Sequence, residues 1–166
     1  MNTDILKRIG VLILLCLIQA LLLNKILLFG CATPLLFVYF ALSLPRNCSR
    51  SSSILWSFVM GFAVDIMSNT PGVAAAAMTL IGAVKPPFLE IFIQHDSEDD
   101  LVASPSSMGV TQYLYYSAAL ILLHNVVFFT LETFSFFDFT GWVCDVLGST
   151  ALTLFFVFVA ANMRKK

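Results

Sequence analysis

The sequence predicts an all-α polytopic membrane protein with six transmembrane helices. Of its 166 residues, 59% are hydrophobic and only 11% are charged, whereas about 25% of the residues in a soluble domain are charged. The apolar residues also gather in runs close to the roughly 20 residues that a helix needs to cross the hydrocarbon core. A soluble domain of this length could not bury so much apolar surface. We therefore expect residues 1–166 to form a single integral membrane domain.

Six apolar runs carry the predicted spans. They cover residues 9–24, 26–44, 54–68, 72–93, 113–133 and 142–162. The third run is short, and Pro86-Pro87 breaks the fourth, which a membrane helix tolerates where neighbouring helices or water satisfy the freed backbone groups. Five spans are the alternative count, because the boundary at 24–25 is weakly marked. The first run follows Lys7-Arg8 as in a signal peptide, but no small-x-small cleavage site follows, and we expect it to stay as the first helix.

The basic residues predict the orientation of these spans. With a cytoplasmic N-terminus, the inner segments hold Lys7, Arg8, Arg46, Arg50, Arg164, Lys165 and Lys166. Because cytoplasmic segments of membrane proteins are enriched in Lys and Arg, both termini are expected to be cytoplasmic. The polar segment 94–112 is then a cytoplasmic loop. Its acidic run beside His95 is more typical of a hydrated connector than of a metal site.

Ionisable side chains inside the predicted spans are the candidates for function, since such residues are costly in lipid and usually face a bundle interior or a wet cavity. They are Asp65, Lys85, Glu90, His124, Glu132 and Asp145. His124, followed by Asn125, is more often a polar contact between helices than part of a proton relay. By the predicted topology, Asp65, Glu132 and Asp145 lie toward the outer ends of their spans.

Asp65 lies in the stretch "GFAVDIMSNTPG", residues 61–72, and has two interpretations. In the first, the carboxylate bonds the local backbone and shapes the turn that follows it. In the second, it forms a polar cluster with Asp145 that lines an outward-facing cavity or binds a partner. The residues of this candidate site are Gly61, Asp65, Ser68, Pro71, Gly72 and Asp145.

Sequence motifs of catalysis and cofactor binding are missing. The chain has no G-x-S-x-G, H-E-x-x-H, Walker A or G-x-G-x-x-G motif, each of which has a known mechanical role in an active site. Its four cysteines show neither C-x-x-C spacing nor a histidine partner. A net charge of −1 does not indicate nucleic-acid binding. We expect a protein that is not an enzyme and holds no cofactor or metal.

Residues 58–78 resemble the central motif of the rod shape-determining MreD family: a glycine, apolar residues and an aspartate, then a serine-containing turn, a glycine and small apolar residues. The chain length, the predicted spans and the basic C-terminus agree with this family. The resemblance implies a non-catalytic scaffold in the bacterial inner membrane that regulates cell shape. It would bind the single-span protein MreC and other membrane proteins of the elongation complex, and so couple MreB filaments to peptidoglycan synthesis.

The same resemblance supplies an alternative function. The MreD family is similar in fold to the membrane-embedded substrate-binding subunits of energy-coupling-factor vitamin transporters. The chain would then be a subunit for small-molecule uptake, with its pocket in an outward cavity near Asp65 and Asp145. A vitamin-sized ligand and a partner ATPase would distinguish this function from that of a scaffold.

Overall fold

The computed structural model of the chain describes residues 2–21, 23, 32–70, 72–93, 101–133 and 139–163, and these contain helices but no β-strand. Pro71 of the candidate site, and residues 94–100 of the predicted loop 94–112, lie outside the described residues. The helices are α1 (Asn2–Leu21), α2 (Val38–Leu42), α3 (Arg50–Ser68), α4 (Val73–Phe92), α5 (Pro105–Met108), α6 (Val110–Thr133) and α7 (Phe139–Met163). An isolated backbone bridge joins Pro45 and Val102.

Four of these helices, α3, α4, α6 and α7, are long and apolar enough to cross a membrane. This confirms the prediction of an all-α chain of membrane-protein character. The N-terminal helix α1 is also 20 residues long, but it carries Asp4, Lys7 and Arg8 in its first two turns. Its apolar part agrees with the first predicted run, 9–24, as far as Leu21.

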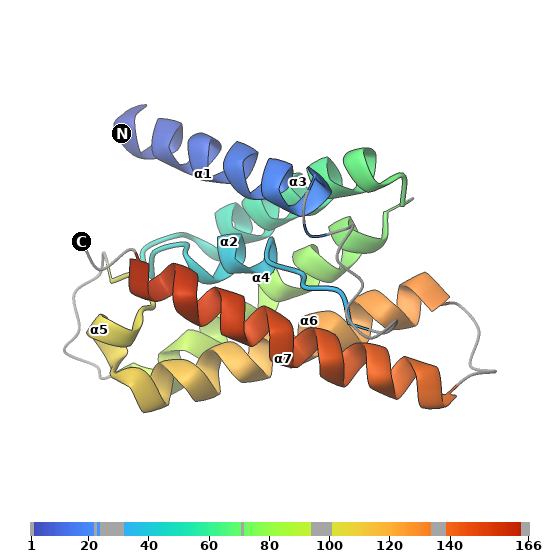
Figure 1. Cartoon of the computed structure of the whole chain (residues 1–166). Helices are drawn as coiled ribbons and strands as arrows, with labels where there is room; N and C mark the ends of the chain where they lie inside the picture. The colour runs from blue at the N-terminus through green and yellow to red at the C-terminus, as the bar shows by residue number, and fades with distance from the viewer. Residues whose placement is uncertain are drawn as a thin grey trace.

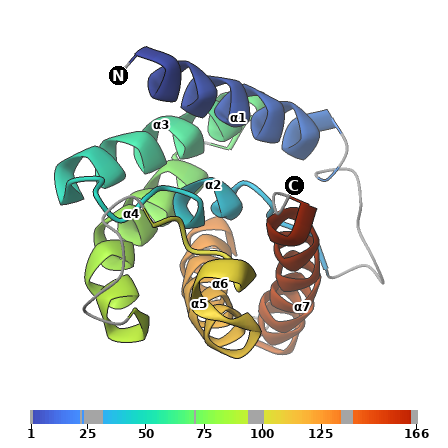
Figure 2. The same cartoon turned by 90° about the vertical axis from the view of Figure 1, so that its left-hand side faces the viewer.

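The helices form a bundle with two distinct ends, shown in Figure 1. We call the end with residues 44–49 and 101–109 the loop end, and the end with residues 69–72 the turn end. Helix α1 begins and α7 ends at the loop end, whereas α3 ends and α4 begins at the turn end. Figure 2 shows α6 between α4 and α7, and α1 lying against α3 at the edge of the bundle.

The fourth predicted span is a continuous helix, contrary to the expected break at its two prolines. Helix α4 runs through Pro86 and Pro87 to Phe92. Each proline removes one backbone N–H from the helix, but the last turns pack on α6, where the rings of Phe88 and Phe92 both contact Tyr116. This aromatic packing holds the helical path beyond the prolines.

The second predicted span, 26–44, does not form the expected continuous helix in its described part. Residues 33–35 have no regular secondary structure, residues 36 and 37 form a turn, and only Val38–Leu42 are α-helical. We call residues 32–44 the central segment, because they run through the middle of the bundle (Figure 2). Sequence hydropathy could not distinguish this conformation from a helix, since both bury the same apolar side chains.

Side chains of α1 and α7 satisfy the non-helical backbone of the central segment. On the α7 side, Ser149 Oγ accepts a 3.0 Å hydrogen bond from Thr33 N. Four residues along α7, Thr153 Oγ1 accepts one of 2.9 Å from Leu35 N. Non-helical backbone is tolerated at membrane depth only where protein or water supplies such partners.

On the α1 side, one amide serves two backbone groups. The Gln19 side chain donates from Nε2 to Pro34 O at 3.0 Å and accepts at Oε1 from Leu36 N at 2.9 Å. It therefore pairs with the segment as the peptide group of a neighbouring strand would. Pro34 lacks an N–H, so this residue leaves no donor to satisfy.

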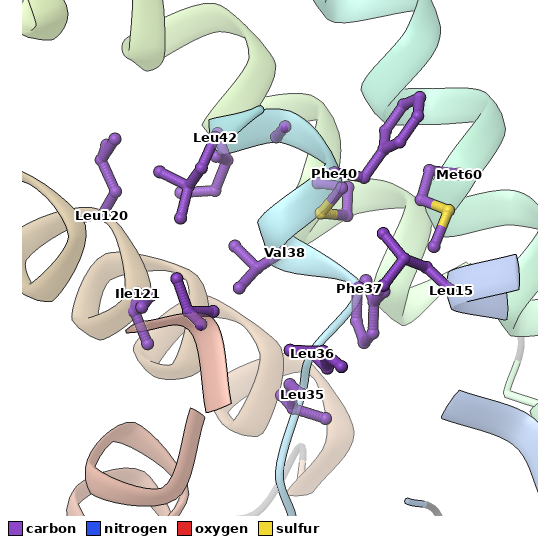
Figure 3. Packing of buried hydrophobic residues seen from close by; sticks show 14 of the residues in the cluster. Leu15, Leu35, Leu36, Phe37, Val38, Phe40, Leu42, Met60, Leu120 and Ile121 are labelled. Carbon is purple, nitrogen blue, oxygen red and sulfur yellow. The ribbon is translucent and has the colours of Figure 1, made fainter. Parts of the chain in front are cut away.

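The apolar side chains of the central segment fill the core between the other helices. Figure 3 shows them packing toward α1, α3 and α6. The residues concerned are Leu35, Leu36, Phe37, Val38, Phe40 and Leu42 from the segment, with Leu15, Met60, Leu120 and Ile121 around it. Phe37, Val38, Ala41 and Leu42 are fully buried. The central segment is thus the core element on which the surrounding helices pack.

We expect Thr153→Val to destabilise the protein by about 1–3 kcal/mol, because the isosteric valine leaves the buried N–H of Leu35 without an acceptor. The matched control is Thr130→Val, since the Thr130 hydroxyl bonds only the Val126 carbonyl of its own helix. Unfolding of both variants in the same detergent provides the measurement. Equal midpoints for the two variants would show that the bond to the central segment contributes nothing.

Candidate functional site

Asp65 of α3 caps the beginning of α4. Its Oδ1 accepts hydrogen bonds from Thr70 Oγ1 at 2.8 Å and from Ala74 N at 2.9 Å, and its Oδ2 accepts one from Ala75 N at 2.8 Å. The N-cap residue of α4 is Gly72, which has no side chain to do this. A carboxylate at a helix N-terminus also interacts favourably with the helix dipole. This geometry agrees with the first interpretation of Asp65, in which the carboxylate bonds the nearby backbone.

The turn that carries this cap depends on two residues with positive φ. Asn69 ends α3 at φ 56°, and its N–H bonds the Asp65 carbonyl. Gly72 has φ 81° and begins α4. Asparagine and glycine are the residues that adopt this left-handed conformation most readily. Ser68 is half-buried in the last position of α3.

Helices α3 and α4 approach each other closely at two glycines. A Cβ on Gly61 would lie 2.5 Å from the Ala74 carbonyl oxygen, which is closer than real contacts allow. Nearer the loop end, a Cβ on Gly82 would lie 2.8 Å from the Ser53 carbonyl oxygen. Small residues permit such approach of helix backbones in membranes. Gly61 and Asp65, one turn apart on α3, therefore fix the start of α4 by contact and by hydrogen bonding.

An open hollow lies beside this turn, lined by Phe62, Asp65, Ile66, Asn69, Thr70 and Gly72. Its apolar part is well exposed, since Phe62 keeps 50% and Ile66 keeps 67% of their accessible surface. Asp65 is only 5% exposed and points its carboxylate toward α4. The hollow consequently offers apolar surface and the polar atoms of the turn. The carboxylate oxygens of Asp65 already accept hydrogen bonds from Thr70, Ala74 and Ala75.

The structure does not bring Asp65 and Asp145 together. All hydrogen bonds of the Asp65 carboxylate go to the turn and to α4. Asp145, half-buried near the start of α7, interacts electrostatically with Glu132 of α6. The end of α3 and the start of α7 lie at the same end of the bundle but on different sides of it (Figures 1 and 2). The polar cluster predicted as the second interpretation of Asp65 is absent.

The other ionisable candidates lie apart from this turn. Lys85 is 2% exposed, and its Nζ donates to the Leu44 carbonyl at 2.6 Å. Glu90 and Glu132 are exposed near ends of α4 and α6. They do not converge with Asp65 on one site.

His124 is fully buried in α6, against the central segment. Its ring contacts Phe37 edge-on, with 5.1 Å between the centroids. Neither ring nitrogen has a well-formed hydrogen bond, and the Oδ1 of the adjacent Asn125 also lacks one. The Asn125 Nδ2 donates to Thr150 Oγ1 of α7 at 2.9 Å. These side chains form a second polar region, at the interface of α6, α7 and the central segment.

The bonds to the central segment were not anticipated from the sequence. Gln19, Ser149 and Thr153 are uncharged, so a search for ionisable residues in apolar runs passes over them. A usable signal was present, because Ser149 and Thr153 are four residues apart and share one face of a helix. Gln19 is likewise an isolated amide within an apolar run.

Comparison of the chain with models of protein families, with curated proteins and with solved structures gives no match.

We expect Asp65→Asn to destabilise the protein by about 1–2 kcal/mol, because asparagine keeps one acceptor but loses the second and the charge at the start of α4. Asp65→Leu removes all three bonds and should cost about 3 kcal/mol. Thr70→Val is the control, since it removes only the hydroxyl donor. Thermal unfolding in detergent ranks the variants, and wild-type stability of Asp65→Leu would refute the capping role.

Proposed function

We propose that this chain is a non-catalytic scaffold of the cell-elongation machinery in the bacterial inner membrane, where it binds an MreC-like single-span protein. The observation that supports the proposal best is the structural role of the motif at residues 58–78. Its glycine, aspartate and small residues serve close packing and helix capping, so they build a rigid surface. A preorganised surface of this kind raises the affinity for a binding partner, because less conformational freedom is lost on association.

The hollow beside the turn is the proposed contact for the partner. Phe62 and Ile66 lie one turn apart on α3 and present large apolar side chains next to the polar turn. An apolar anchor beside a few polar groups is typical of residues that dominate binding energy. The single transmembrane helix of an MreC-like protein, continuing into an outer domain, can meet both parts at once. Other membrane proteins of the elongation complex are proposed to assemble around this pair.

The chain path supports cytoplasmic termini. Helix α1, the central segment, α3, α4, α6 and α7 traverse the bundle in alternating directions, so that α1 begins and α7 ends at the loop end (Figure 1). We propose that these are the six predicted membrane crossings, with the central segment as a second crossing that is helical only at Val38–Leu42. Arg46 and Arg50 then lie on the cytoplasmic side, as the positive-inside rule requires.

One observation favours the alternative of a subunit for small-molecule uptake. Transporters often place substrate beside a discontinuous membrane segment with unwound backbone. The central segment has this character, and the buried His124 lies against its Phe37. Binding of a vitamin-sized ligand by the purified chain, with dependence on a partner ATPase, would support this alternative and count against the scaffold. Neighbouring genes for MreB and MreC would support the scaffold.

We expect Phe62→Ala to weaken co-purification with an MreC-like partner at least about fivefold, as loss of an apolar anchor does. The control is Phe155→Ala on α7, which removes a phenylalanine of similar exposure, 64% against 50%, away from the turn. Quantitative affinity capture of the co-expressed partner provides the measurement. Equal capture by the two variants would remove the hollow from the proposed interface, and no capture by the wild-type chain would refute the scaffold function.

Reporter fusions test the topology separately. A reporter that is active only in the cytoplasm should be active when it is joined after Lys166 and when it is joined before Met1. Six crossings return the chain to the side on which it started. A third fusion, in the turn after Asn69, is the internal control and should report the outer side. A periplasmic C-terminus together with a cytoplasmic N-terminus would contradict six crossings and would require an odd number of crossings.

A further inference from the structure

A contact between two sulfur atoms joins α1 to the end of α3. The thiol of Cys16 on α1 donates to Sδ of Met67 at 3.4 Å. Met67 is the last residue but one of α3, so this contact lies near the turn end. Figure 2 shows α1 lying against α3 at the edge of the bundle. The thiol and the thioether pack here as small apolar groups with a weak hydrogen bond between them.

Cys16 belongs to the face by which α1 is attached to the bundle. Within residues 5–21 the buried positions follow the i, i+3, i+4, i+7 spacing of a single helix face, and they are Leu12, Leu15, Cys16 and Gln19. Gln19 holds the central segment by two hydrogen bonds. Since Cys16 lies one turn before Gln19, a movement of α1 at the sulfur contact also moves the amide that holds the central segment.

Met67 is accessible, although its partner is buried. Met67 keeps 48% of its accessible surface, whereas Cys16 keeps 5%. The methionines of the core, Met60 and Met78, are fully buried. Because susceptibility to oxidation follows exposure, a small neutral oxidant such as hydrogen peroxide reaches the sulfur of Met67 before those of the core.

Oxidation would place a polar group in this contact. The peroxide transfers one oxygen atom to a lone pair of the Met67 Sδ, which is oxidised to a sulfoxide, and the peroxide is reduced to water. The sulfur atoms of Met67 and Cys16 are 3.4 Å apart, which leaves no room for an oxygen atom between them. The new group must therefore push the two sulfur atoms apart or remain beside apolar side chains, and both weaken the contact.

We propose that Met67 is an oxidation site, and that its sulfoxide loosens α1 from α3 and thereby exposes Cys16. The reduced thioether keeps α1 attached, and the sulfoxide allows this part of α1 to open. The opening reaches the central segment through Gln19, which is on the same face of α1. This site is independent of the proposed scaffold function.

The test measures how fast a maleimide labels Cys16 in the full chain in detergent, before and after treatment with hydrogen peroxide. Serine replaces Cys31, Cys48 and Cys144, so that Cys16 carries the remaining thiol. Peroxide should raise the labelling rate about tenfold, because a buried thiol reacts when its contact opens locally and a polar group in an apolar contact favours the open form. Mass spectrometry of the peptides should locate the added oxygen on Met67.

Three variants of this chain separate the effect of Met67 from that of peroxide in general. Met67→Leu keeps an apolar side chain of similar volume that peroxide does not oxidise, and the rise in labelling should disappear. The matched control is Met163→Leu, which removes a methionine of 76% exposure at the end of α7 and should keep the rise. Met67→Gln places a polar amide at the contact and should label fast without peroxide.

Three outcomes would overturn the proposal. Oxidation of Met163 under conditions that leave Met67 reduced would show that peroxide does not reach the contact. An unchanged labelling rate after oxidation of Met67 would show that the sulfoxide does not loosen α1. An equal rise in the chain with Met67→Leu would assign the effect to another residue.

Discussion

The structure depends on how the backbone of the central segment is satisfied inside an apolar bundle. Each unpaired N–H or carbonyl group costs several kcal/mol in a lipid-like interior. Gln19, Ser149 and Thr153 supply the missing partners, and they come from helices near the two ends of the chain. The positions of α1 and α7 are therefore coupled, although the two helices belong to different sides of the bundle.

The α3–α4 pair solves a related problem at the turn end. A helix that begins at a glycine has free N–H groups and no side chain at its N-cap. Asp65 provides both acceptors from the preceding helix, and it can reach them because Gly61 brings the two backbones together. A carboxylate that is costly in lipid is thus stabilised by the charge and geometry of a helix end. This accounts for the aspartate in physical terms without any chemical reaction.

Sequence reasoning predicted the parts of the fold that follow from hydropathy and from turn chemistry. The four long apolar helices and the turn after Asp65 belong to this class. It could not predict that residues 33–35 have no regular secondary structure and that residues 36 and 37 form a turn, because their apolar side chains suit a buried helix equally well. It also suggested a cluster of Asp65 with Asp145 from their depth alone. Depth gives no information on which side of the bundle a helix lies, and the end of α3 and the start of α7 are on different sides.

The hydrogen bonds from α7 to the central segment have a consequence for biogenesis. Ser149 is synthesised 116 residues after Thr33, and Thr153 is synthesised 118 residues after Leu35. Until α7 enters the membrane, these early N–H groups must remain hydrated or be held by the insertion machinery, because lipid offers no acceptor. In a nascent chain that stops before α7, the N–H groups of Thr33 and Leu35 therefore lack the acceptors that they have in the folded protein.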